Sequence, residues 1–195
     1  MNTIEQALRR VTADLQAANV PFALIGGMAV SLRSRDRFTN DVDLAVSVAT
    51  DEEAERIVFG LSHDGFRPDK VLEQTENNRL ATVRLLHTDS GGPYVDLLFA
   101  SSGIEPEIVA AAPMTRILPG LRIPVATVGH LVALKVLAMN DSTRMQDMID
   151  ARNLIAVADT GDLEQARDAL RLIEQRGYQR DKNLMDEFDR LLSKM

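Results

Sequence analysis

The sequence predicts an α/β fold, in which a short mixed β-sheet with flanking helices is followed by a C-terminal helical region. Short apolar runs, bounded by turn residues, alternate with helical patterns up to about residue 126. From residue 127 to the end, helical spacing alone continues. We therefore expect an α/β core over residues 1–126 and a helical region over residues 127–195 that closes a pocket against the core.

The composition limits the possible functions. The chain has 195 residues, with 45% hydrophobic and 26% charged residues, which is typical of one folded domain of ordinary size. The absence of cysteine excludes disulfides, thiolate metal sites and cysteine nucleophiles, and it fits a cytoplasmic location. A net charge of −7 argues against broad non-specific binding to nucleic acid. No apolar run approaches the ~20 residues of a membrane span, and we expect no membrane partner.

Helical spacing and alternation predict the elements of the first half in order. Ile4, Leu8, Val11 and Leu15 indicate a helix over about residues 3–18, which ends before Pro21. A strand over residues 22–25 follows and leads into a helix from Met28. After a polar loop over residues 33–40 we expect a strand over 41–48 and a helix over 51–63.

The second half begins with further strands and ends in helices. Residues 79–87 and 94–99 are predicted to pair as antiparallel strands across the turn over residues 88–93. Residues 115–118 and 121–125 form a second predicted hairpin around Pro119-Gly120. The predicted helices cover residues 128–139, 144–157, 162–176 and 181–195.

Three aspartates within apolar runs are the main candidates for chemistry. Asp41 and Asp43 stand one residue apart, so on a strand their side chains point the same way. Asp96 stands in the apolar run of residues 94–99, and a neighbouring strand could bring it alongside. Like charges raise one another's pKa, and a buried carboxylate without a partner is unfavourable. A hard cation such as Mg²⁺ among the three carboxylates would make the cluster favourable.

The pair Gly26-Gly27 follows a predicted strand, and it has two interpretations. The glycines could simply form a turn. Alternatively, bare backbone N–H groups at the start of a helix could approach a phosphate group.

Together these residues resemble a known signature. Gly26-Gly27, then Arg37, Thr39 and Asp41-Val-Asp43, with Asp96 on a later strand, resemble the DNA polymerase beta-like nucleotidyltransferase superfamily. Within it the chain is most similar to the AbiEii-type nucleotidyltransferases, a family that includes toxins of toxin–antitoxin systems. The pattern Gly-Gly-x-Ala and the helical run that holds Lys135, Arg144, Asp147 and Asp150 are the closer cues.

The resemblance implies transfer of NMP from an NTP, such as ATP, to an acceptor hydroxyl, with release of pyrophosphate. It implies that Asp41 and Asp43 hold two Mg²⁺ ions, while Asp96 holds the ion nearer the acceptor and helps to deprotonate it. The implied nucleotide site comprises Gly26, Gly27, Arg37, Thr39, Lys135, Arg144, Asp147 and Asp150. The chain departs from the pattern where the superfamily often has serine at Gly27 and where this branch often has lysine at Gln146.

Several alternatives remain at this point. Lys135 could be a surface lysine, and Arg144, Asp147 and Asp150 could form a surface ion-pair face. The arginines of the 33–40 loop could be solvated or could form a cationic mouth for a triphosphate or an RNA backbone. The acceptor could be a tRNA 3′ end, a protein or a small molecule such as an aminoglycoside, and an antitoxin could be a partner. The alternative to an enzyme is a nucleotidyltransferase-like domain that binds a nucleotide or a protein without catalysis.

Overall fold

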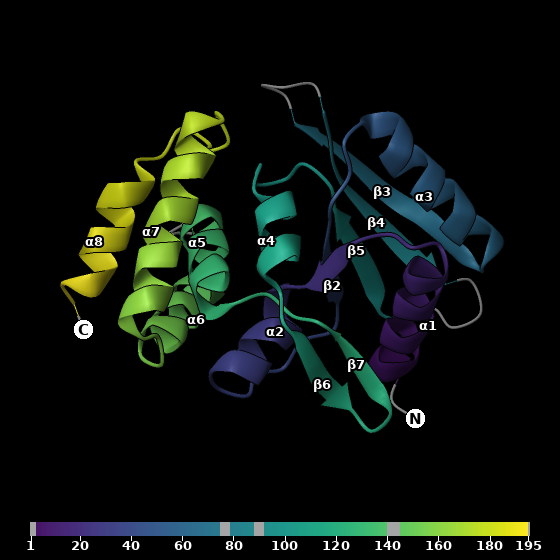
Figure 1. Ribbon diagram of the computed structural model, residues 1–195, viewed down its shortest axis with the longest axis horizontal. Coiled ribbons are helices and arrows are strands. Elements are labelled where there is room, and N and C mark those ends of the chain that lie inside the picture. The colour runs from purple at the N-terminus through teal and green to yellow at the C-terminus, as the bar shows by residue number, and fades with distance from the viewer. Residues whose placement is uncertain (1–2, 75–78, 88–91, 140–144, 195) are drawn as a thin grey trace.

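A mixed β-sheet forms the centre of the molecule, as the computed structural model shows for residues 3–74, 79–87, 92–139 and 145–194 (Figure 1). In these residues the sheet has the strand order β1-β2-β5-β4-β3. Its strands are β1 (Phe22–Leu24), β2 (Val42–Val46), β5 (Tyr94–Leu98), β4 (Arg79–His87) and β3 (Phe66–Gln74). The pair β2–β5 is parallel, whereas β1–β2, β5–β4 and β4–β3 are antiparallel. The predicted mixed sheet is therefore confirmed.

Helices lie on both sides of this sheet (Figure 1). The helices α1 (Thr3–Ala17) and α3 (Asp51–His63) lie on one side, whereas α2 (Gly26–Arg33) and α4 (Glu105–Ala111) lie between the sheet and the C-terminal helices. The C-terminal layer contains α5 (Val128–Ala138), α6 (Met145–Ile155), α7 (Thr160–Gln175) and α8 (Leu184–Leu192). The predicted α/β class with a C-terminal helical region is therefore confirmed.

The predicted second hairpin joins the two parts of the chain. It consists of β6 (Met114–Leu118) and β7 (Leu121–Pro124), and the N–H of Ala126 donates to the carbonyl of Leu24 in β1 at 3.0 Å. Thr127 then caps α5, because its side chain accepts a hydrogen bond from the backbone N–H of His130. One hydrophobic core, which runs from α1 to α8, continues across this junction.

Two elements were missed because their sequences lack a periodic apolar pattern. Strand β3 is exposed along most of its length, contains Pro68 and has register shifts against β4, which are all features of an edge strand. Helix α4 is short and has proline in its first turn, and its Glu105 side chain points inward to accept hydrogen bonds from Ser101 and Ser102.

Several predicted boundaries also differ, those of α2 and β2 among them. Helix α2 begins at Gly26 rather than Met28, because β1 ends at Leu24 and the glycines form the first turn of the helix. Strand β2 is shorter than predicted and ends at Val46. The predicted turn over residues 88–93 falls largely, and the predicted helix break over residues 140–142 entirely, outside the described residues.

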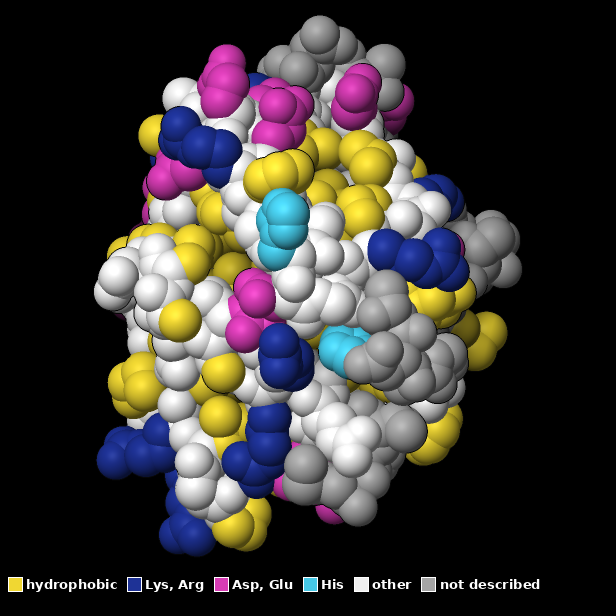
Figure 2. Space-filling view, turned by 90° about the vertical axis from the view of Figure 1, so that its right-hand side faces the viewer, with side chains coloured by type: hydrophobic (Ala, Val, Ile, Leu, Met, Phe, Trp, Pro, Cys, Tyr) yellow, Lys and Arg dark blue, Asp and Glu magenta, His cyan; other side chains and the backbone are white. Residues whose placement is uncertain are grey.

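The face formed by α1, α3 and the edge of the sheet carries mixed side chains. Figure 2 shows hydrophobic, acidic and basic groups interspersed over this face, with no continuous basic stripe in view. Among the described helices, none combines the length and the apolar character that crossing a membrane requires. The three aspartates lie on the other side of the sheet, where they line a cleft together with residues of α5 and α6.

Candidate active site

Strand register places opposite charges in one row across the sheet. Asp43 of β2 pairs with Asp96 of parallel β5, and Asp96 pairs with Arg84 of antiparallel β4. Arg84 in turn pairs with Lys70 of β3. Directly paired residues share a face of the sheet, so these four side chains point to the same side. They all line one cleft with a volume of about 650 Å³.

The first glycine of α2 lies against the Asp43 carboxylate. Gly26 has a φ of +64°, and a Cβ at this position would lie 1.9 Å from Oδ2 of Asp43. A side chain here would both strain the backbone and displace the carboxylate. Helix α2 therefore begins with backbone at the cleft wall, and its N-cap residue Ile25 makes no side-chain cap. The first N–H groups of a helix lack partners within the helix, which suits an anion.

The second glycine leaves room for two predicted site residues. A Cβ on Gly27 would lie 2.2 Å from Nη2 of Arg37 and 2.8 Å from Oγ1 of Thr39. A serine at this position would therefore collide with Arg37 unless that side chain moved. Glycine at this position leaves room for the Arg37 guanidinium and the Thr39 hydroxyl against the first turn of α2.

The Asp43 carboxylate is held in an unfavourable electrostatic environment. Burial of the side chain and, after it, the neighbouring charges of Asp96 and Asp41 raise its pKa to about 6. Lys135 and the backbone N–H of Gly27 act in the opposite direction and lower it. Among the described residues, Asp43 forms no ion pair. A cation bound here would therefore relieve repulsion that the protein alone leaves in place.

This raised pKa predicts a pH dependence of stability in the metal-free protein. The pKa of Asp43 rises from an ordinary value of 3.8 to about 6 on folding, so the folded state favours the protonated carboxyl. Its contribution to stability should be present at about pH 4 and be lost as the pH rises to about 6. Urea unfolding of the wild type and Asp43→Asn between about pH 4.5 and 7 measures this. The Asp43→Asn variant should gain stability relative to the wild type across this interval, and a pH-independent difference would contradict the assignment.

Arg84 is one of the cleft residues that were not predicted from the sequence. Its Nε donates to Oδ1 of Asp96 at 2.8 Å, and its Nη2 donates to Oδ2 at 2.6 Å. The same Nη2 lies 3.8 Å from Oδ2 of Asp41. This bidentate pair raises the pKa of Arg84 above its ordinary value. Alternation on β4 indicates only that Thr82 and Arg84 face away from the buried Val83 and Leu85, and the pairing of Arg84 with Asp96 depends on the strand register.

The helical side of the cleft is held by a second group of charges. Nζ of Lys135 on α5 lies 2.8 Å from Oδ1 of Asp147 and 2.9 Å from Oδ2 of Asp150 on α6. Nε of Arg37 lies 3.5 Å from the same oxygen of Asp150. Gln146, which stands where this branch often has lysine, donates to Oδ1 of Asp150 at 2.8 Å.

Burial excludes the surface interpretations of Lys135 and Asp150. The side chain of Lys135 is 11% exposed, so it is not a surface lysine. The side chain of Asp150 is 1% exposed, so it does not belong to a surface ion-pair face. Asp150 joins Arg37 from the 33–40 loop to Lys135 of the helical region. Arg33, which the structure places at the end of α2 rather than in the loop, is not free in solvent, because its guanidinium donates to the carbonyls of Val125 and Ala126.

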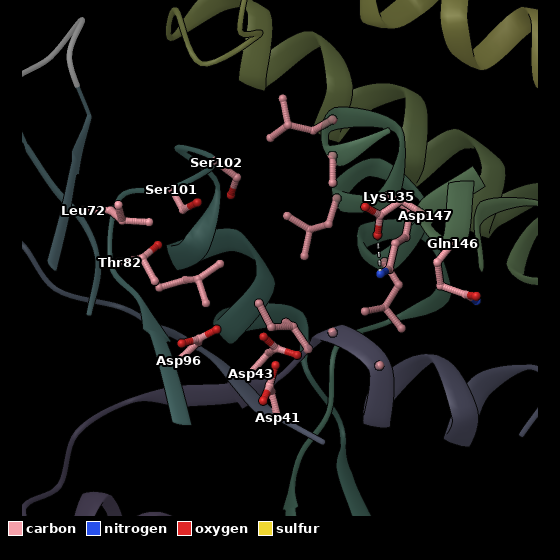
Figure 3. Close-up of a pocket in the computed structure, with 18 of the residues that line it drawn as sticks. Asp41, Asp43, Leu72, Thr82, Asp96, Ser101, Ser102, Lys135, Gln146 and Asp147 are labelled. Atoms are coloured by element: carbon pink, nitrogen blue, oxygen red, sulfur yellow. Dashed lines mark hydrogen bonds and ion pairs between the residues drawn. The ribbon is translucent and has the colours of Figure 1, made fainter. Parts of the chain in front are cut away.

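The structure brings most of the predicted site residues to the cleft. Asp41, Asp43 and Asp96 lie together at its floor, with Thr82 and Ser101 on the sheet side (Figure 3). Lys135, Asp147 and Gln146 lie on the opposite, helical side (Figure 3). Gly26, Gly27 and Arg37 complete the predicted residues among those that line the cleft. Asp150 is buried behind the lining residues Arg37 and Lys135, Thr39 is not among the lining residues, and Arg144 lies outside the described residues.

The carboxylates of Asp41, Asp43 and Asp96 are suitable ligands for Mg²⁺, but their positions in this structure do not yet form a metal site. Among the described residues, no three His, Cys, Asp or Glu side chains are grouped to hold a metal ion. In this arrangement Arg84 binds both oxygens of Asp96. Three carboxylates on one wall are nevertheless the hard oxygen ligands that Mg²⁺ prefers, and Asp43 is the one that a cation would stabilise most.

Comparison with protein families gives one match over nearly the whole chain. A family model described as "Nucleotidyl transferase AbiEii toxin, Type IV TA system" matches residues 6–194. This range includes the sheet, the cleft and the C-terminal helices. No curated protein matches the sequence significantly.

Solved structures with the same fold include three nucleotidyltransferases or similar proteins. An antigenic nucleotidyltransferase-like protein from Paracoccidioides brasiliensis is 19% identical with a TM-score of 0.53, covering 93% of this chain and 91% of that chain. The antibiotic-resistance factor ANT(2'')-Ia is 15% identical with a TM-score of 0.51, covering 100% and 92%. The lincosamide antibiotic adenylyltransferase LnuA, bound to lincomycin, is 15% identical with a TM-score of 0.51, covering 81% and 100%. At these sequence identities the similarity shows that this chain shares the fold of the three proteins.

Proposed function

Because the chain belongs to the AbiEii nucleotidyltransferase family and is a nucleotidyltransferase, we propose that it moves NMP from an NTP to an acceptor hydroxyl with the help of Mg²⁺. The observation that carries the proposal is the register of Asp43 beside Asp96, with Asp41 on the same wall of the cleft. In the reaction the acceptor oxygen bonds to the α-phosphorus, and the bond to the bridging oxygen breaks. Pyrophosphate leaves, and the acceptor hydroxyl gives up its proton.

Asp41, Asp43 and Asp96 would hold the metal ions, two in number. Bound Mg²⁺ would supply charge neutralisation for the triphosphate and would lower the pKa of the acceptor hydroxyl. Asp96 stands next to Arg84 on the sheet side, so we assign it to the ion nearer the acceptor. Asp43 lies against the start of α2, and we assign it, together with Asp41, to both ions.

The other side of the cleft would bind the triphosphate. Gly26 and Gly27 place backbone rather than side chains at the start of α2, where a helix N-terminus favours an anion, and Lys135 offers a positive charge across the cleft. Asp147 would orient Lys135 through their 2.8 Å contact. Asp150 would act as a positioning residue because it contacts Arg37, and Thr39 because its hydroxyl donates to the carbonyl of Asp41.

The metal side and the triphosphate side of the cleft belong largely to different parts of the chain, which suggests a role for each part. Residues 1–126 would form the catalytic α/β core, and residues 127–195 would close the nucleotide pocket. Asp150 contacts Arg37 of the core and Lys135 of the helical region. These contacts would couple closure of the helical region over the pocket to binding of the nucleotide in the cleft. The non-catalytic alternative finds no support in this arrangement, since a binding domain gains nothing from three like charges on one wall.

The charges on the sheet side of the cleft favour an anionic acceptor. Lys70 and Arg84 follow the aspartates in the row across the sheet, and Arg180 lines the same cleft, where it donates to the carbonyl of Ser101. These cations would repel a polycationic acceptor such as an aminoglycoside and would attract phosphates. We therefore favour a nucleic-acid 3′ end, such as that of tRNA, over a protein or a small antibiotic.

The family also supports a biological setting. We propose that the chain is the toxin of a toxin–antitoxin system and that a cognate antitoxin limits its activity. A cytoplasmic location, where NTP and tRNA are present, is part of the same proposal.

Incubation with each α-labelled NTP, Mg²⁺ and one acceptor pool at a time tests the proposal. The pools are total RNA, total protein and a set of aminoglycosides and lincosamides. Label should enter the RNA pool at its 3′ ends, and chelation of Mg²⁺ should prevent this. Label in the antibiotics alone would refute the acceptor class while leaving the reaction class intact. Binding of NTP with no label in any pool would favour the non-catalytic alternative.

A further inference from the structure

A single arginine controls whether the three aspartates can act together. We propose that Arg84 is an internal cation that holds Asp96 in the metal-free protein and competes with Mg²⁺ for that carboxylate. This inference rests on the proposed function, because it concerns the same Mg²⁺ site. It adds a step that the family assignment does not contain, namely that Arg84 must leave Asp96 before the site can be complete.

The geometry of the pair makes the competition direct. Both oxygens of Asp96 accept hydrogen bonds from Arg84, at 2.8 and 2.6 Å. The side chain of Asp96 is only 12% exposed, so few directions remain from which an ion could reach it. A metal ligand and a bidentate guanidinium need the same lone pairs, and two cations at one carboxylate also repel each other.

The pair also explains how the protein tolerates the aspartates without metal. Arg84 neutralises Asp96 directly, and its Nη2 lies 3.8 Å from Oδ2 of Asp41. This reduces the repulsion within the cluster, because one positive charge is shared between two carboxylates. Asp43 receives less relief, since its pKa remains raised to about 6.

The surroundings of Arg84 can accommodate its side chain after it leaves Asp96. Its guanidinium carbon lies 4.8 Å from the centroid of the Tyr94 ring, so the ring already supports the group from one side. The side chain is 35% exposed toward the cleft, which gives it room to turn. After release, the charge stays on the sheet side of the cleft, where we propose that the acceptor binds.

The test measures metal binding without nucleotide or acceptor. Mn²⁺ takes the same oxygen ligands as Mg²⁺, and its free form can be followed by electron paramagnetic resonance. Arg84→Gln should bind Mn²⁺ about tenfold more tightly than the wild type, because one charge-assisted pair no longer has to be broken. Equal or weaker binding by Arg84→Gln would overturn the proposal.

Arg79→Gln is the matched control. Arg79 lies on the same strand and pairs with Asp51 at 2.6 Å, away from the residues that line the cleft. This variant should bind Mn²⁺ as the wild type does. Thermal unfolding adds a second readout: Arg84→Gln should be less stable than the wild type without metal, and Mn²⁺ should remove most of that difference. For Arg79→Gln the loss of stability should be the same with and without Mn²⁺, and an equal metal-independent loss in both variants would overturn the proposal.

A double-mutant cycle shows whether Asp96 is the contested ligand. In an Asp96→Asn background, the further change Arg84→Gln should alter Mn²⁺ affinity by less than about twofold. A gain of the full size in this background would mean that Arg84 acts through its general field rather than on Asp96, and the proposal would be wrong. None of these readouts uses transfer activity. The inference about Arg84 can therefore fail while the proposed reaction stands, and the proposed reaction can fail while the inference about Arg84 stands.

Discussion

Asp43→Asn should remove nearly all NMP transfer while leaving the fold intact. The rate should fall by about a thousandfold or more, because metal binding supplies several kcal/mol of transition-state stabilisation. Folding should survive because the substitution removes a negative charge from a wall where Asp41 and Asp96 already raise the pKa of Asp43. At neutral pH the metal-free variant should be at least as stable as the wild type.

Thermal unfolding with NTP and increasing Mg²⁺ tests the cause of this loss. The wild type should gain stability with Mg²⁺, whereas Asp43→Asn should gain much less. Asp41→Asn should resemble Asp43→Asn in activity, although Asp41 is more exposed and its removal should affect metal-free stability less. Equal metal-linked stabilisation in the wild type and both variants would refute the assignment of these residues as metal ligands.

Asp96→Asn should separate chemistry from nucleotide binding. If Asp96 holds only the ion nearer the acceptor, then Asp41, Asp43 and the phosphates still hold the other ion. NTP affinity should therefore stay within a few-fold of the wild type, while the chemical step falls by about a thousandfold. The acceptor hydroxyl would lose the cation that lowers its pKa, and this loss acts mainly in the transition state.

Calorimetric NTP binding beside single-turnover kinetics decides between these roles. Asparagine keeps the shape of aspartate and can still accept one hydrogen bond from Arg84, so the register of β4 and β5 should be retained. A folded variant that no longer binds NTP would place Asp96 in the nucleotide site. A variant that transfers at the wild-type rate would make Asp96 a structural residue.

The sequence predicted the elements whose apolar residues have a clear period. Helix α3 and strand β4 were predicted with their observed bounds, since each presents one buried face. Strand β3 was missed because an edge strand buries little and needs no apolar alternation. Helix α4 was missed because it is too short for a period to appear.

Sequence patterns also identify only some of the residues of the candidate site. Asp43 and Asp96 could be selected from the sequence because they interrupt apolar runs. Arg84 could not be assigned to the site in the same way, because its place beside Asp96 depends on the register between β4 and β5. The buried Asp150 was expected to line the pocket, and only the packing of α5, α6 and the 33–40 loop shows that it lies behind.

The most direct test of the central claim follows both parts of the NTP in one reaction. The protein is incubated with Mg²⁺, the preferred acceptor pool and NTP labelled either at the α- or at the γ-phosphate. We predict that the α-label enters the acceptor and that the γ-label leaves as pyrophosphate in equal amount, with neither event in Asp43→Asn. Release of the γ-label as orthophosphate, or transfer of the γ-label to the acceptor, would show a different phosphoryl chemistry and would contradict the account.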